Sequence, residues 1–185
     1  MISLRPYRTK DFVLIVVCAL IWSFLSRYVF SNLGPQSSYI FMIIAITIIA
    51  SIAVRLVRKI GAATLLFTLG ALLSYEVGNL GISGNEKFIS LLVAGLIFEL
   101  VLIVMSNANK NTALLTAGPI ASAAIPLVGA LLISATVVQE NISSVINFMI
   151  LSGFAGIVGI IFGNWIWTYL RTTKFALRFL ETLKE

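Results

Sequence analysis

Long runs of apolar residues alternate with short polar segments along the whole chain. A helix needs about 20 apolar residues to cross the roughly 30 Å hydrocarbon core of a bilayer. Six runs approach or exceed this length: Phe12–Phe30, Tyr39–Val57, Ile60–Gly78, Phe88–Met105, Ala113–Thr136 and Val145–Leu170. The pattern predicts an all-α, polytopic membrane protein in which residues 1–170 form a single domain of six transmembrane helices.

The distribution of positive charge indicates how these helices are oriented. The segments between predicted helices alternate between the two sides of the membrane, and all of the 13 Lys and Arg residues except Arg27 and Lys87 then fall on one side. Lys and Arg accumulate on the cytoplasmic side of membrane proteins. We therefore expect a multi-pass protein of the cell membrane with both termini in the cytoplasm and lipid as its immediate partner.

Residues 171–185 have a different pattern, in which apolar and charged positions are spaced as on an amphipathic helix. Phe175, Phe179 and Leu183 share one face, and Lys174 and Arg178 lie on another. This predicts a cytoplasmic tail helix that lies on the inner membrane surface or on a partner protein.

The composition narrows the chemistry of the chain. Hydrophobic residues make up 59% and charged residues 11% of the sequence, and the mean hydropathy is +1.05. A soluble domain carries roughly 25% charged residues, so a soluble enzyme or a nucleic-acid-binding module is disfavoured. The chain has no His and a single Cys, Cys18, and it lacks nucleotide-binding and catalytic motifs. We therefore expect no metal site, no cofactor, no disulfide and no enzymatic activity.

Three ionisable residues fall inside the predicted spans, where each costs at least ~2.5 kcal/mol to insert. Arg27 and Glu76 are expected at the same depth near the outer edge of the membrane. They would either form a buried ion pair that fixes helix register or belong to an outward-facing polar pocket. Glu99 is expected near the middle of the membrane, where it would either be a neutral acid bonded to a hydroxyl or act as a ligand contact or proton-linked switch. The candidate hydroxyls are those of Thr68, Thr116 and Ser122.

Two helices carry residues that alter how helices pack. The fifth span contains Pro119 and Pro126, which bend a helix and leave backbone carbonyls free, either beside a cavity or at a simple kink. The sixth span contains Gly156, Gly159 and Gly163, and the last two form a GxxxG pattern that allows another helix to approach closely. The pattern serves either packing within the chain or docking of a partner.

Two local stretches add to the architecture. Val57-Arg-Lys-Ile-Gly61-Ala-Ala-Thr-Leu-Leu enters the third span, and Leu92-Val-Ala-Gly95-Leu-Ile-Phe-Glu99-Leu-Val lies in the fourth. With six spans and short connections, they resemble the substrate-binding S component of energy-coupling factor (ECF) transporters. The resemblance implies ATP-driven uptake of a vitamin or other micronutrient, with a separate transmembrane coupling protein and two ATPases as partners. The first span departs from the family's Ala-x-x-x-Ala docking pattern, since the chain has Ala19-Leu-Ile-Trp-Ser23 there.

The function favoured by these features is a membrane-embedded solute-binding subunit of an ECF-type uptake transporter. Its small-molecule ligand would contact charged and amide side chains in an outward-facing pocket: Arg27, Glu76, Asn79, Asn85, Glu99 and Asn147. The alternative is a non-catalytic helical accessory subunit of a larger membrane enzyme complex, of respiratory or monooxygenase type, for which the glycine face is a docking surface. A lipid-modifying enzyme that uses Glu76 or Glu99 as an acid or base is the weakest reading.

Overall fold

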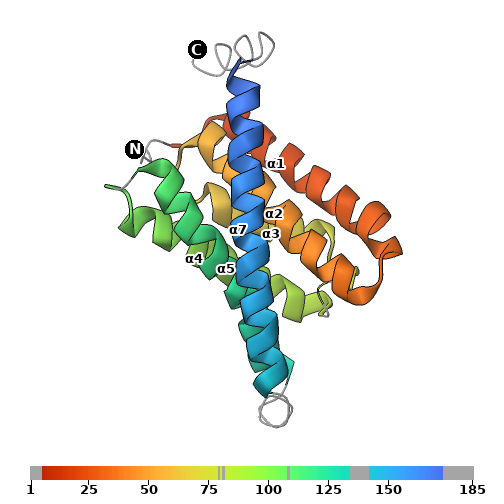
Figure 1. Ribbon diagram of the computed structural model, residues 1–185. Helices are drawn as coiled ribbons and strands as arrows, with labels where there is room; N and C mark the ends of the chain where they lie inside the picture. Colours follow the sequence, from red (N-terminus) through yellow and green to blue (C-terminus); the bar gives the residue numbers. More distant parts are fainter. Residues whose placement is uncertain (1–5, 79, 81, 108, 134–141, 173–185) are drawn as a thin grey trace.

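The computed structural model describes residues 6–78, 80, 82–107, 109–133 and 142–172. The predicted tail helix, apart from its first two residues, and the predicted ligand contact Asn79 lie outside the described residues. Every regular element within them is helical (Figure 1).

The helices follow the apolar runs of the sequence. Helix α1 spans Thr9–Phe24 and continues through a π-helical turn η1, Leu25–Val29, into a 3₁₀ turn η2, Phe30–Asn32. The remaining helices are α2, Pro35–Val57; α3, Ala62–Leu73; α4, Gly84–Val104; α5, Lys110–Ile133; and α7, Ile142–Thr172. Five of the helical segments in the described residues, Thr9–Asn32, α2, α4, α5 and α7, are long and apolar enough to cross a membrane.

Helix α3 is shorter than the full-length third span that the sequence predicted. The apolar run Ile60–Gly78 contains a helix of only 12 residues, which is about 18 Å long at 1.5 Å per residue. A tight turn precedes it, in which Arg58 and Gly61 both adopt positive φ angles, of 53° and 90°. Helix α3 therefore reaches only part of the way across a ~30 Å hydrocarbon core.

The helices pack as a closed bundle. Helix α7 lies between α2 and α5, α5 packs on α4, α4 on α3, and α1 covers α3 and α2. In Figure 1, α7 is the long helix that runs down the middle of the view, and its lower end extends below α1, α2, α3 and α4. The buried residues form one continuous apolar core, and many other large apolar side chains face outward as expected for a surface in contact with lipid.

The glycines of α7 lie at its contacts with α2 and α5. A Cβ at Gly159 would lie 2.7 Å from the carbonyl oxygen of Ile44, and one at Gly163 would lie 3.3 Å from that of Ile48. On the next face, a Cβ at Gly156 would lie 2.9 Å from the carbonyl oxygen of Gly118. Of the two roles open to the glycine pattern, these residues serve packing within the chain.

The ends of the bundle differ in charge. The start of α1, the end of α2 and the end of α7 share one end, since Asp11 pairs with Lys59 and Arg55 lies near Arg171. Arg27 and Lys87 lie at the opposite end, beside the last residues of α3. The separation of cations along the described chain thus agrees with the charge pattern of the sequence.

Candidate functional site

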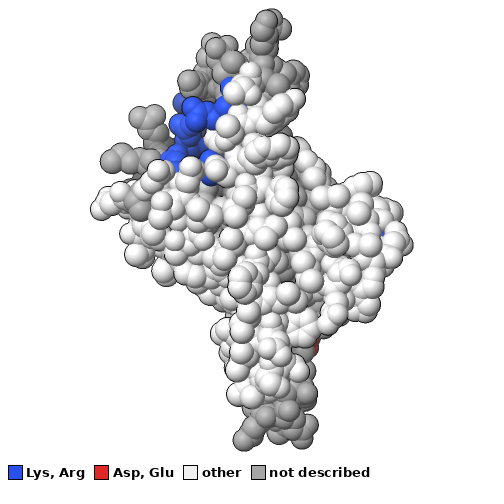
Figure 2. Space-filling model, in the orientation of Figure 1, with Lys and Arg blue, Asp and Glu red and all other residues white. Residues whose placement is uncertain are grey.

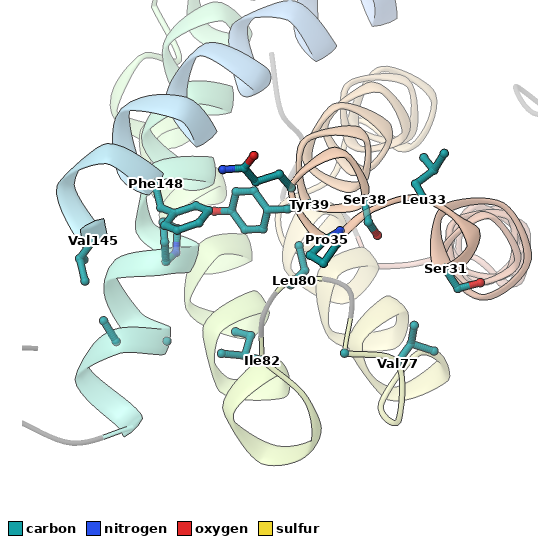
Figure 3. Close-up of a pocket in the computed structure, with 15 residues that line it drawn as sticks. Ser31, Leu33, Pro35, Ser38, Tyr39, Val77, Leu80, Ile82, Val145 and Phe148 are labelled. Carbon is teal, nitrogen blue, oxygen red and sulfur yellow. The ribbon is translucent and has the colours of Figure 1, made fainter. Parts of the chain in front are cut away.

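A cavity of about 550 Å³ lies at the end of the bundle opposite the Lys- and Arg-rich end. Its walls come from the start of α2, the second half of α5, the start of α7 and the segment that follows α3 (Figure 3). The lining residues are Ser31, Leu33, Pro35, Gln36, Ser38, Tyr39, Val77, Gly78, Leu80, Ile82, Pro126, Gly129, Ala130, Val145 and Phe148.

Local sequence features create this space. Gly34 and Pro35 begin α2, and a proline at the first helical position supplies the required φ without losing a hydrogen bond. Gly129 lies close to Ile82, whose Cδ1 would be 3.2 Å from an added Cβ. Pro126 lines the cavity, whereas Pro119 packs against Gly156 of α7. One of the two prolines therefore borders a cavity and the other serves helix packing.

The cavity wall is aromatic and uncharged. The rings of Tyr39 and Phe148 meet edge to face with centroids 5.3 Å apart, and Figure 3 shows them projecting from α2 and α7. The Tyr39 hydroxyl is hydrogen-bonded to the hydroxyl of Ser152, which ties the two helices together. Ser38 also lines the cavity, and its Oγ is buried without a hydrogen-bond partner. Among the residues that the structure describes, no Asp, Glu, Lys or Arg belongs to the wall.

The residues predicted to contact a ligand lie elsewhere in the described chain. Arg27 Nη2 and Glu76 Oε2 are 3.8 Å apart, so these residues are paired, but their side chains are 49% and 86% exposed. The expectation of a buried ion pair is therefore wrong. Asn85 accepts a hydrogen bond of 2.7 Å from the Tyr75 hydroxyl, and Asn147 is exposed on α7. Arg27, Glu76, Asn85 and Asn147 are all absent from the cavity wall.

Glu99 has a different environment from the one expected. Its Oε2 accepts a hydrogen bond of 3.1 Å from the backbone N–H of Ala63, and the amides of Gly61 and Thr64 also face the carboxyl group. These amides form the first turn of α3, whose dipole favours a negative charge. Glu99 Oε1 is buried without a partner. None of the predicted hydroxyls bonds to Glu99: those of Thr68 and Thr116 donate to carbonyls of their own helices, and that of Ser122 is unpaired.

Lys87 lies near the start of α4, the helix that also carries Glu99. Its Nζ is completely buried and donates to the carbonyl oxygens of Ser74 at 2.7 Å and Val77 at 2.8 Å. Lys87 and Glu99 are separated by 12 residues of α4, or about 18 Å, which matches the length of α3. Helix α4 therefore places a cation at the C-terminal end of α3 and a carboxyl at its N-terminal end.

The stretches Val57–Leu66 and Leu92–Val101 are in contact with each other. A Cβ at Gly95 would lie 3.0 Å from both Thr64 Cα and Phe67 Cβ, so α3 and α4 approach closely there. Together with the bond from Ala63 to Glu99, this contact gives both stretches a role in holding α3 against α4.

The turn before α3 is also tied to the N-terminal segment. The Tyr7 hydroxyl donates to the carbonyl oxygen of Ile60 at 2.6 Å, and Lys59 Nζ donates to that of Pro6 at 2.6 Å. Burial raises the pKa of Tyr7 to about 12, with smaller contributions from the charges of Glu99 and Asp11. The Tyr7 phenol therefore remains protonated and keeps its hydrogen bond through the neutral pH range.

Within the described ranges, no group of three or more His, Cys, Asp and Glu residues is arranged to hold a metal ion. Comparison with protein families, curated proteins and solved structures finds no match to this chain. The cavity is thus the feature of the described residues that points to a function.

Proposed function

We propose that this chain is the membrane-embedded solute-binding subunit of an ECF-type uptake transporter for a vitamin or other micronutrient. The observation that carries the proposal is the cavity. Its volume of about 550 Å³ lies within the ~300–1,000 Å³ typical of small-molecule sites. The cavity lies away from the end that collects Lys and Arg, which the positive-inside rule would make cytoplasmic, so we expect the cavity to open toward the outside, where a solute would be captured.

The chemistry of the wall restricts the solute. A charged molecule would lose its hydration there without gaining a counter-charge from the described part of the wall, because none of the described lining residues is Asp, Glu, Lys or Arg. Tyr39 and Phe148 offer aromatic surface, and the unpaired hydroxyl of Ser38 offers one hydrogen bond. We therefore propose an uncharged, largely apolar solute with a polar group that bonds to Ser38.

The energy for uptake would come from partner proteins. The sequence contains no nucleotide-binding motif, so ATP would be hydrolysed by separate ATPases that act through a transmembrane coupling protein. The alternative, an accessory subunit of a membrane enzyme complex, relied on the glycine face as a docking surface. That face is occupied by α2 and α5 within the chain, which favours the solute-binding function.

Native mass spectrometry of the full chain, purified in a mild detergent, tests the proposal. We expect one small uncharged organic molecule to remain bound per chain. Ser38→Ala should weaken its binding about fivefold, the effect of losing a hydrogen bond of ~1 kcal/mol. Ser37→Ala is the matched control, because Ser37 is exposed and lies outside the cavity wall.

A second variant tests the cavity by filling it. Ala130 lines the cavity, so Ala130→Phe should place a ring inside it and abolish binding. Leu131→Phe adds a ring at the next position, which is 66% exposed, and should leave binding unchanged. Copurification of large enzyme subunits in place of a small molecule, or equal binding by both phenylalanine variants, would contradict the proposed function.

A further inference from the structure

Four cationic side chains meet at the end of the bundle opposite the cavity. Arg55 and Arg58 come from the end of α2, Lys110 from the start of α5 and Arg171 from the end of α7. Arg171 repels Arg55, and both Arg55 and Arg58 repel Lys110, so the four charges are close together. We refer to these four residues as the basic cluster. Figure 2 shows Lys and Arg side chains gathered at the upper end of the visible face.

The acidic residues of the described chain lie elsewhere. Asp11 is engaged by Lys59, and Glu99 faces the first turn of α3. Glu76 and Glu86 lie at the opposite end of the bundle, after α3 and in the first turn of α4. Within the described part of the chain, the basic cluster therefore has no carboxylate to balance its charge.

Arg55 is a buried member of the basic cluster, so the cluster does not consist only of exposed side chains. Arg55 is only 8% exposed, and one of its guanidinium nitrogens, Nη2, donates a hydrogen bond to Asn111 Oδ1 at 2.9 Å. The Nε of the same guanidinium is buried and has no hydrogen-bond partner. Arg58 lies against it, with its own Nε donating to the carbonyl oxygen of Arg55 at 3.2 Å. A buried cation with an unused donor is costly unless an anion pairs with it.

We propose that the basic cluster binds the phosphate group of an anionic phospholipid. The cluster lies at the ends of three helices of membrane-spanning length, at the level where phospholipid headgroups surround such a bundle. Guanidinium groups suit phosphate because they offer several N–H donors in a plane, and basic residues at the membrane surface attract anionic lipids. The proposal is independent of the cavity and of the proposed transport function.

Lipid retention by the full chain tests this site. The purified protein is incubated with phosphatidylglycerol or phosphatidylcholine in detergent, and bound lipid is measured by native mass spectrometry. We expect phosphatidylglycerol to be retained preferentially. Arg58→Gln and Lys110→Gln should each weaken its binding about fivefold, the effect of removing one cation worth ~1 kcal/mol. Both side chains are exposed, so the variants should fold.

Two further measurements distinguish binding at the basic cluster from nonspecific attraction of anionic lipid to positive charge. Lys10→Gln removes a cation from the same end outside the basic cluster, and it should leave phosphatidylglycerol binding unchanged. An equal loss in Lys10→Gln, or equal retention of phosphatidylcholine, would overturn the proposal. Inorganic phosphate at the same concentration as the lipid should not displace it. Displacement would assign the site to a soluble phosphate and overturn the lipid assignment.

Discussion

Alanine at Gly159 should weaken the contact that holds α7 against α2. An added Cβ would overlap the Thr47 hydroxyl and lie 2.7 Å from the carbonyl oxygen of Ile44. Because a carbon and a carbonyl oxygen approach to about 3.3 Å, the backbones would have to separate by about 0.6 Å there. Thr47 is held in place, since its Oγ1 donates to the carbonyl oxygens of Ile43 at 2.8 Å and Ile44 at 3.0 Å. Overpacking of this kind costs about 1–3 kcal/mol.

Gly153→Ala provides the control within the same helix. The nearest atom to a Cβ at Gly153 is the carbonyl oxygen of Pro119, at 3.9 Å. Both substitutions gain the same ~0.5–1 kcal/mol of helix propensity, so the difference between them measures the overlap alone. Thermal unfolding in detergent should give a Tm for Gly159→Ala that is roughly 2–12 °C below that of Gly153→Ala. Equal Tm values would refute the assignment of Gly159 to the contact between α7 and α2.

Three further predictions concern charged and polar contacts. Glu99→Gln keeps an acceptor for the Ala63 amide and should cost ~1 kcal/mol of unfolding free energy, whereas Glu99→Ala leaves that amide unpaired and should cost ~1–3 kcal/mol. Equal costs would show that the contact contributes nothing. Because the pKa of Tyr7 is raised from 10.0 to about 12, its contribution to stability is present below pH 10 and is lost as the pH rises toward 12. The fall in unfolding free energy over that range should be shallower for Tyr7→Phe, and an unchanged slope would argue against the shift. A double-mutant cycle of Arg27→Ala and Glu76→Ala should give a coupling below ~1 kcal/mol, because the pair is exposed. A larger coupling would indicate that the pair is desolvated.

The long helices could be predicted because hydropathy is a local property of the chain. The predicted span Tyr39–Val57 corresponds to α2, and Phe88–Met105 corresponds to α4. Both helices begin four residues earlier than the apolar runs, since α2 starts at Pro35 and α4 at Gly84. An apolar-run criterion excludes such polar first turns, although a proline at the first helical position is a usual start signal.

The length of α3 could not be predicted in the same way. The predicted span runs from Ile60 to Gly78, but the helix ends at Leu73, and the backbone at both of its ends is bonded to side chains of α4. Lys87 donates hydrogen bonds to carbonyl oxygens that follow the last turn of α3, and Glu99 accepts one from an amide in the first turn of α3. From the sequence alone, Lys87 was expected at the end of an outer connection. The one sequence feature that could have indicated these contacts is the spacing of 12 residues between Lys87 and Glu99, which equals the length of α3.

The candidate site was missed for a related reason. Charged and amide side chains were the residues expected to contact a ligand, because they are costly in a membrane. In the structure, Arg27 and Glu76 pair with each other, and Glu99 bonds to a helix end. The described lining of the cavity instead consists of apolar and hydroxyl-bearing residues and one amide, Gln36. Nothing in the local sequence distinguishes Ser38 of this lining from exposed Ser37.

Taken alone, the sequence determined that the chain is helical, that its outer surface suits lipid, and that its cations collect at one end, because these properties are sums over neighbouring residues. Only the tertiary structure decided that α3 is short, that Gly159 and Gly163 face α2, and that a cavity opens beside Tyr39. Each of these depends on contacts between residues far apart in the chain, and such contacts leave no local periodicity.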